Sequence, residues 1–406
     1  MTTFDTPLLR QLARGLLLGA VALLAACGGG GDDEAGAAAG TLRLALADAP
    51  SCGFDHVHVT VLGVRVHRSA GAEPGDTGWV DLMLPAPRRL DLLTLVNGTL
   101  EELGQTPLAA GRYTQMRLLL APNTAGSPLA NAVTPSGGAE VALTTPSAVQ
   151  SGLKTSVDIE VRPFEVADFV IDFDACRSVV RAGRSGQYLL KPVLRVLPRL
   201  AGAGARVVGH VAGAGATVSL QVDGEPVRAT TPDPTSGRYE LYPAAPGSYT
   251  LVVAGGGRAT GVVTGVPVHA DRATVVGTAT APIVLPPAVP REVGGELTVA
   301  ASVSGADHAT VRATQAFGSV APLVVEVAQV PVAVGDAYTL TLDAAAPRIA
   351  AYDPGTAAPS FAAAGAVAGR YTLQARLLPL GLSRAAALDI GAGVPDPLPA
   401  VDFAFP

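Results

Sequence analysis

Short runs in which apolar and polar residues alternate recur along most of this chain. In the first run Leu42, Leu44 and Leu46 occupy every second position, which is the period of a strand with one buried face. Turn formers separate the runs, because the 406 residues include 47 glycines and 33 prolines. The only helical turns that we expect lie within residues 90–104, where a Thr and a Glu have capping-box spacing. The pattern predicts an all-β chain.

Length and spacer composition divide the chain into modules. A chain of 406 residues suits two or three domains rather than one. Four prolines between residues 282 and 290 predict a stiff spacer. We therefore expect three tandem β-sandwich domains of the immunoglobulin or transthyretin type, over residues 41–200, 205–286 and 291–406.

One short motif returns in each of the three modules. Tyr113, Tyr249 and Tyr371 each follow a glycine by two positions and are each followed by a threonine. Glycine allows a tight backbone before a strand, and sandwich domains use a tyrosine at such a corner whose hydroxyl bonds to nearby backbone. We expect these tyrosines to pack inward with their hydroxyls on backbone, and the three modules to be related.

The first 27 residues have the layout of an export signal. Two arginines precede an apolar run, and small residues then lead to Cys27. The run has 11 residues, whereas a membrane-spanning helix needs about 20. The ending Leu-Ala-Ala-Cys resembles the lipobox of bacterial lipoproteins. That resemblance implies a signal peptide over residues 1–26 and acylation of Cys27 by fatty chains such as palmitate. Because Gly28 rather than Asp follows, it also implies the outer membrane of a Gram-negative cell envelope.

The segment after the signal and the overall charge indicate what the chain binds and what it does not. Residues 27–40 are rich in glycine and poor in apolar side chains, so we expect a flexible tether with a reach of about 20 Å. The expected partner at this end is the lipid bilayer, held through acylated Cys27. The net charge of −6 and the presence of lysine at only two positions argue against nucleic-acid binding.

Two further cysteines, Cys52 and Cys176, remain to be paired. In an oxidising compartment, an even number of cysteines left after Cys27 predicts a disulfide. Closing a loop of about 125 residues would remove roughly 5 kcal/mol of unfolded-state entropy in the chain model. The bridge would tie the start of the first module to its end. Two buried thiols or a pair of metal ligands are the alternatives.

Several motifs of the first module occur in a specific order: HVHVTVLGVRVH, WVDL, LDLLTLVNG, DFDACRSVV and YLLKPVLRV. With them, about residues 40–197 resemble a family of bacterial lipoproteins known only as a domain of unknown function. The resemblance implies a secreted β-rich domain, often followed by further β modules, without an established activity. Residues 205–286 are similar to carboxypeptidase-regulatory-like modules, which are grouped with carbohydrate-binding-like folds and imply a small transthyretin-type sandwich.

His56 and His58 are the best metal-ligand candidates, because they fall on one face of a predicted strand beside Asp55. His67 is expected on the following strand, and imidazoles at this spacing are able to share Zn²⁺. The spacing fixes no acidic or cysteine ligand, however, and exposed histidines on strands are common. We therefore expect no metal and no cofactor, with His56 and His58 as weak candidates.

Two pairs of residues have the spacing of catalytic groups. Asp172 and Asp174 alternate with apolar residues near Cys176, so both carboxylates are expected on one strand face. Paired carboxylates bind Ca²⁺ or act in acid–base catalysis, but the solvated face of a half-buried strand is the simpler interpretation. Ser151 and Lys154 have the spacing of a serine nucleophile and its lysine base, but the other elements of that motif are missing. We expect no catalytic residue.

Sugar binding requires flat aromatic faces, and the chain offers few. Trp79 is the only tryptophan, and Tyr239 and Tyr242, three positions apart, cannot both face outward from one regular strand. Aromatic residues make up 4% of the chain, which leaves few rings once the cores are filled.

Together these features predict a membrane-anchored cell-envelope lipoprotein with a structural, display or partner-binding role and no catalysis. Its further partner would be an unknown protein or glycan. A carbohydrate-binding surface lipoprotein is the first alternative. A metal-dependent envelope enzyme is the second, and it would require His56, His58 and an acidic group to converge.

Overall fold

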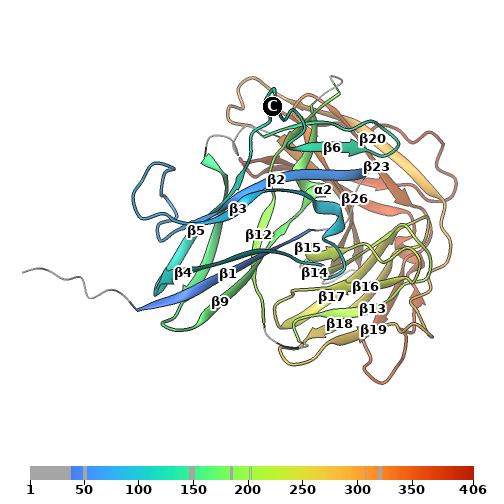
Figure 1. Cartoon of the computed structure of the whole chain (residues 1–406). Coiled ribbons are helices and arrows are strands. Elements are labelled where there is room, and N and C mark those ends of the chain that lie inside the picture. The colour runs from blue at the N-terminus through green and yellow to red at the C-terminus, as the bar shows by residue number, and fades with distance from the viewer. Residues whose placement is uncertain are drawn as a thin grey trace, which may run out of the picture. The chain divides into compact units, whose positions relative to one another are not determined.

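The computed structural model describes residues 38–48, 53–145, 151–182, 186–200, 202, 204–306, 308–318 and 322–406. Residues 39–406 form one compact unit. The expected signal peptide, Cys27, most of the tether and Cys52 lie outside the described residues. Strands are the main regular structure of the described part of the chain, which has only a few short helical turns (Figure 1), so the all-β prediction is confirmed.

The first module is built from two sheets. The smaller has the strand order β12-β9-β1-β4, in which β1 runs parallel to β9 and antiparallel to β4. The larger has the order β10-β11-β7-β6-β2-β5-β8, and β3 also pairs with β2. The strands are β1 (Ala39–Asp48), β2 (Phe54–His67), β3 (Val80–Asp91), β4 (Glu101–Ala109), β5 (Gly111–Leu120), β6 (Ala132–Pro135), β7 (Val141–Thr144), β8 (Leu153–Val161), β9 (Val166–Phe173), β10 (Val179–Ala182), β11 (Gln187–Leu190) and β12 (Leu194–Pro198).

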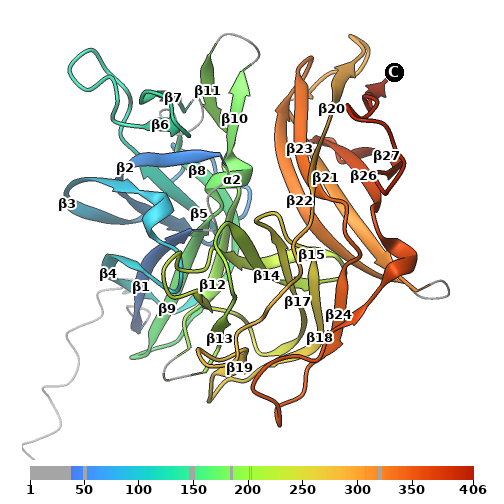
Figure 2. The same cartoon turned by 90° about the vertical axis from the view of Figure 1, so that its right-hand side faces the viewer.

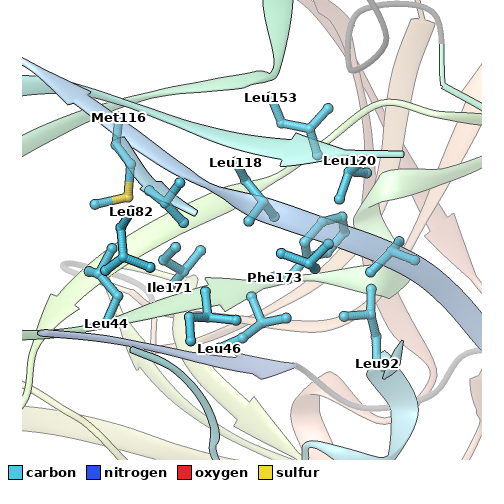
Figure 3. Close-up of a cluster of buried hydrophobic side chains, with 14 of the residues drawn as sticks. Leu44, Leu46, Leu82, Leu92, Met116, Leu118, Leu120, Leu153, Ile171 and Phe173 are labelled. Atoms are coloured by element: carbon cyan, nitrogen blue, oxygen red, sulfur yellow. The ribbon is translucent and has the colours of Figure 1, made fainter. Parts of the chain in front are cut away.

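Alternation on these strands produces the core of the first module (Figure 3). Leu44 and Leu46 of β1 and Phe173 of β9 point from the smaller sheet toward Leu118 of β5 and Leu82 of β3 in the larger one. Leu44, Leu46 and Phe173 have no exposed surface. Because each buried leucine or phenylalanine contributes roughly 1.5–3 kcal/mol, this layer accounts for much of the stability of the module.

The second module pairs a three-stranded sheet, β16-β13-β19, with a six-stranded sheet, β15-β14-β17-β18-β24-β25, most of which is labelled in Figure 2. The two sheets share one buried cluster. Their strands are β13 (Val207–His210), β14 (Ala216–Val222), β15 (Glu225–Thr230), β16 (Arg238–Leu241), β17 (Gly247–Gly255), β18 (Gly261–Val268), β19 (Thr274–Val276), β24 (Arg348–Ala351) and β25 (Ala362–Ala363).

The third module has the sheets β23-β20-β28 and β22-β21-β26-β27, which share another buried cluster. The long hairpin of β21 and β22 and the strand β26 dominate it. Its strands are β20 (Pro290–Val299), β21 (His308–Phe317), β22 (Leu323–Ala333), β23 (Ala337–Asp343), β26 (Arg370–Leu378), β27 (Leu382–Asp389) and β28 (Phe403–Phe405), with the short helix η3 (Gly365–Val367) before β26.

Two strands from the range expected to form the third module belong to a sheet of the second module, which the sequence did not suggest. The range 291–406 was expected to form its own sandwich, yet β24 and β25 lie in the sheet of the second module, where β24 runs parallel to β18. Without them β18 would be an edge strand with unpaired backbone groups. Ile349 of β24 also packs on the cluster that contains Val252 and Val262. The two modules are therefore interlocked.

Three local features differ from expectation. Within residues 90–104 only η1 (Leu92–Thr94) is helical, and it is capped by Asp91 through the Leu93 amide rather than by the expected threonine. The range begins at the end of β3 and reaches β4 only at Glu101. The helix α2 (Ala175–Ser178) was not expected. His67 lies on the same strand as His56, because β2 continues through a bulge between Val61 and Gly63. Among the described residues, no helix has the length and apolar character to span a membrane.

The hydroxyls of the three motif tyrosines donate hydrogen bonds to backbone carbonyls, as expected. The hydroxyls of Tyr113 and Tyr249 donate to carbonyls four residues earlier, Ala109 at 3.0 Å and Ala245 at 2.7 Å. That of Tyr371 donates to the Asp343 carbonyl at 2.6 Å, so its partner is on another strand. Tyr113 and Tyr371 are buried, whereas Tyr249 is half-buried. The expected bond to nearby backbone is therefore present for Tyr113 and Tyr249, whereas Tyr371 bonds backbone 28 positions away in the sequence.

Candidate functional site

Two histidines and two carboxylates lie close together on the outer face of the larger sheet in the first module. His56 and His58 point outward from β2, as predicted, while Val57 and Val59 between and after them are fully buried. Antiparallel pairing sets Asp91, the last residue of β3, opposite His58. We call His56, His58, Asp91 and Glu140, which precedes β7, the histidine–carboxylate cluster.

Contacts within the histidine–carboxylate cluster are short. The Nδ1 atom of His56 lies 2.7 Å from Oδ2 of Asp91, and Nδ1 of His58 lies 3.1 Å from Oε1 of Glu140. The two imidazoles are stacked, with ring centroids 5.5 Å apart and planes 24° apart. His56, His58 and Asp91 each present a possible ligand atom within 4.8 Å of the others. The acidic partners that sequence spacing did not identify are therefore present.

The two histidines have opposite electrostatic environments. The hydrogen bond and the negative charge of Asp91 raise the pKa of exposed His56. Burial, followed by the positive charge of Arg89, lowers the pKa of His58. Arg89 also contacts Glu140, so the carboxylate is shared between a guanidinium and an imidazole.

The other residues of the predicted metal group lie elsewhere. The Asp55 carboxylate accepts the Gly137 amide at 3.1 Å and thereby fixes the turn after β6. His67, at the far end of β2, packs on Trp79 with ring centroids 5.0 Å apart, and its Nε2 lies 3.0 Å from the Thr77 carbonyl. Neither belongs to the histidine–carboxylate cluster.

The expectation that Asp172 and Asp174 share a solvated face is wrong. Asp172 is 5% exposed and is paired with the guanidinium of Arg228 on β15. Asp174 lies beyond the end of β9 and caps α2, where it accepts the Arg177 amide at 3.0 Å. Alternation had placed Asp172 on the outer side of its strand correctly, but the second module covers that side.

Of the candidate nucleophile pair, Ser151 lies just before β8 and Lys154 lies on this strand. Lys154 is exposed on β8, opposite Arg117 of β5. The carbonyl of Ser151 accepts a hydrogen bond from the Arg117 guanidinium at 3.0 Å.

The aromatic residues considered for sugar binding pack against protein. The guanidinium carbons of Arg65 and Arg117 lie 4.9 and 5.2 Å from the centroid of the Trp79 ring, and the indole donates to the Glu73 carbonyl. Tyr239 is fully buried and donates to the Val276 carbonyl. Tyr242 is buried beside Arg206, whose guanidinium carbon lies 4.4 Å from the ring centroid.

A second group of charged side chains joins the modules. Arg177 of α2 donates to Glu326 of β22 at 2.6 Å, and Gln221 of β14 exchanges two hydrogen bonds with the Glu326 backbone. With Asp172 and Arg228 these residues form what we call the junction cluster. Burial raises the pKa of Glu326 to about 7, although the positive charges of Arg177 and Arg312 oppose the shift. None of these pairings has a signal in local sequence, because each joins residues more than 50 positions apart.

A cavity of about 540 Å³ adjoins the junction cluster. Arg177, Gln221 and Glu326 line it, together with hydroxyls of β14 and β23 such as Thr217 and Thr339. The volume suits a small ligand. The described residues that line it include no aromatic ring, so it lacks the flat face on which a sugar would stack.

The lipid and disulfide predictions fall partly outside the described residues. Cys27 and Cys52 lie there, so acylation and the Cys52–Cys176 bridge stay predictions. Cys176 is half-buried on α2.

Comparison with family models finds a match over part of the chain. Residues 39–192 match the model of a domain of unknown function (DUF4382), which confirms the expected domain of unknown function in the first module. No curated protein matches the sequence.

The similarities among solved structures are distant. Two are type II cohesin–X-dockerin complexes from Acetivibrio cellulolyticus. The N-terminal interface mutant shares 22% identity over 21% of this chain and 59% of that chain, with a TM-score of 0.18. The C-terminal interface mutant shares 24% over 20% and 57%, with a TM-score of 0.17. A leucine-rich repeat protein from Bacteroides thetaiotaomicron shares 12% over 61% and 26%, with a TM-score of 0.15. The match spans less than two thirds of each of these chains.

Proposed function

We propose that this protein is a cell-envelope lipoprotein, anchored in the outer membrane through acylated Cys27, that displays interlocked β-sandwich modules to a partner and catalyses no reaction. The lipobox-like ending of the first 27 residues supports the anchor. One acyl chain holds a protein to a bilayer only weakly, whereas two or more hold it durably. The carboxypeptidase-regulatory-like sandwich expected from the sequence of residues 205–286 would fit a display role.

The observation that carries the display role is the interlocking of the modules. Strand β24 continues the sheet of the second module beside β18, and the junction cluster adds ion pairs that join the first module to the second and to the third. Inter-domain contacts of modest size normally leave domains free to move. A shared sheet and buried ion pairs oppose such motion, which suits a body that presents loops and strand edges in fixed positions.

The use of the candidate catalytic groups supports the absence of catalysis. Asp172 is held by a buried guanidinium, and Asp174 caps a helix. A carboxylate or hydroxyl that acts on substrate needs a positioned acid or base partner and access to a pocket. These side chains serve the assembly of the fold instead.

The loop between β8 and β9, which contains Phe164, suits a membrane-facing position. Phe164 is 90% exposed, and its backbone φ of 63° is unusual for a residue with a side chain. Its amide donates to the carbonyl of Ala39, which follows Cys27 by only twelve positions. A Cβ on Gly40 would lie 2.3 Å from the Arg162 carbonyl, so glycine is needed for β1 to lie against this loop.

Photo-cross-linking in living cells tests the proposal. A photoreactive residue replaces Phe164 in one variant and Val284, which is 62% exposed on the second module, in another. A third variant carries it at exposed Asp271 as the control. We expect lipid adducts at Phe164 and a discrete protein adduct at Val284 that is absent at Asp271. A glycan array with the purified chain tests the alternative of a carbohydrate-binding lipoprotein. Specific glycan binding without a protein adduct would favour that alternative.

A further inference from the structure

Three segments far apart in the sequence build the histidine–carboxylate cluster. The histidines come from the start of β2, Asp91 from the end of β3, and Glu140 from the approach to β7. All three segments belong to one sheet, in which β2 pairs with β3 on one side and with β6 on the other. A rigid sheet therefore fixes the relative positions of two imidazoles and two carboxylates, independently of the display role.

Asp91 is held in place before any ligand arrives. Its Oδ1 atom accepts the amides of Val57 and Leu93, each at 3.2 Å, and its side chain is only 14% exposed. This leaves Oδ2 directed at His56. A carboxylate fixed by two backbone amides has little side-chain freedom left to lose when it binds a cation.

His58 carries a polar atom that the protein does not satisfy. Its Nδ1 is buried and lies 3.1 Å from the Glu140 carboxylate, but the contact lacks hydrogen-bond geometry. Buried ring nitrogens are almost always bonded, and an exception calls for an ion, a water or a strained contact. When an ion binds the other ring nitrogen of His58, the proton stands on Nδ1, where the Glu140 carboxylate lies close enough to accept it.

The chemistry of the four groups suits Zn²⁺. Zinc takes imidazole nitrogens and carboxylate oxygens in tetrahedral sites, with metal–ligand distances of about 2 Å, so its ligands lie roughly 3.3 Å from one another. The contact between His56 and Asp91, at 2.7 Å, is close to that separation, and possible ligand atoms of His56, His58 and Asp91 all lie within 4.8 Å of one another. Two carboxylates also balance the two charges of the ion, although Arg89 shares Glu140 and opposes the cation.

We propose that His56, His58 and Asp91 bind one Zn²⁺ ion on the outer face of the first module, with Glu140 orienting the His58 ring. Carboxylates that contact a zinc-bound histidine fix its ring and raise its basicity. A surface site with three protein ligands leaves a fourth position open to water or to a group from a partner.

Zinc titration of the purified full chain, first stripped with a chelator, tests this site. We expect calorimetry to show one Zn²⁺ per chain and Co²⁺ to give the visible absorption of a tetrahedral site. His56→Ala/His58→Ala should abolish both signals, and Glu140→Gln should weaken binding by about ten- to a hundredfold. His269→Ala, at a histidine of the second module bonded to Arg272, is the matched control and should bind as wild type does.

Folding of the variants is checked by thermal unfolding without metal. His56 and His58 face outward, so the double variant should unfold at the temperature of the stripped wild type, and Zn²⁺ should stabilise only the wild type and the control. Asp91→Asn is a second variant that keeps a capping side chain for η1; it should bind Zn²⁺ more weakly. The proposal is overturned if wild type binds no stoichiometric Zn²⁺, or if the double variant binds it equally well.

Discussion

Arg228 on β15 and Asp172 on β9 form an ion pair across two modules, and their side chains are only 2% and 6% exposed. Burial lowers the pKa of Arg228 to about 10, against the nearby charge of Asp48. Asp48 in turn accepts the Ala175 amide at 2.9 Å and so joins β1 to α2. Such a pair adds little to the free energy of unfolding, because removing both charges from water is costly. Its main effect is to fix the arrangement in which the two modules dock.

Removing one partner of this pair should be costly. Arg228→Met leaves the Asp172 carboxylate buried without a counter-charge, so we expect the free energy of unfolding to fall by about 3–5 kcal/mol. The double variant Arg228→Met/Asp172→Leu should recover most of that loss, because no isolated charge remains. Urea unfolding measures both variants. Arg112→Met, which breaks the exposed Arg112–Asp158 pair, is the control and should leave stability nearly unchanged. Equal losses in the single and double variants would contradict the prediction.

The corner tyrosines should differ in what their hydroxyls contribute. Tyr371→Phe leaves the Asp343 carbonyl without its donor in a buried place, so we expect a loss of about 1–3 kcal/mol in the free energy of unfolding. Tyr249→Phe should lose less, because water reaches the half-buried site of Tyr249. Denaturant unfolding of the two variants decides this, and a larger loss for Tyr249→Phe would refute the ranking.

Asp343 should make stability depend on pH. Burial raises the pKa of its carboxyl to about 6, from an ordinary value of about 3.9. Between these values the folded state binds more protons than the unfolded state, so the free energy of unfolding falls as pH rises from about 4 to about 6.

Asp343→Asn should remove this part of the pH dependence, because the amide carries no charge to bury. Chemical unfolding at several pH values between 4 and 7 measures the slope. Asp271→Asn makes the same change of charge at an exposed position and controls for net charge. A slope in Asp343→Asn as steep as in the control would show that Asp343 does not titrate in this range.

Cys52 and Cys176 should be linked in the exported protein. Mass analysis under non-reducing conditions should find the two peptides joined, and Cys176→Ser should lower the free energy of unfolding by about 2–5 kcal/mol. Cys27→Ser is the matched control, which should leave the bridge in place. Alkylation of two thiols in exported protein without prior reduction would reject the bridge.

Local sequence predicted the strands well and the sites only in part. Alternation placed Leu44 and Leu46 in the core and set His56 and His58 on one outer face, because side-chain direction follows from the two-residue period. The same period could not show that another module covers Asp172, since coverage depends on long-range packing. Asp91 and Glu140 were missed as partners of the histidines because strand pairing, not spacing along the chain, brings them together.

Attachment to the membrane through Cys27 is tested most directly by palmitate labelling of cells that express the full chain, followed by membrane fractionation. We expect the wild type to carry the label and to sediment with outer membranes. Cys27→Ser should lose both properties, whereas Cys176→Ser should keep both. A Cys27→Ser chain that is labelled and sediments like the wild type would contradict lipid anchoring through this residue.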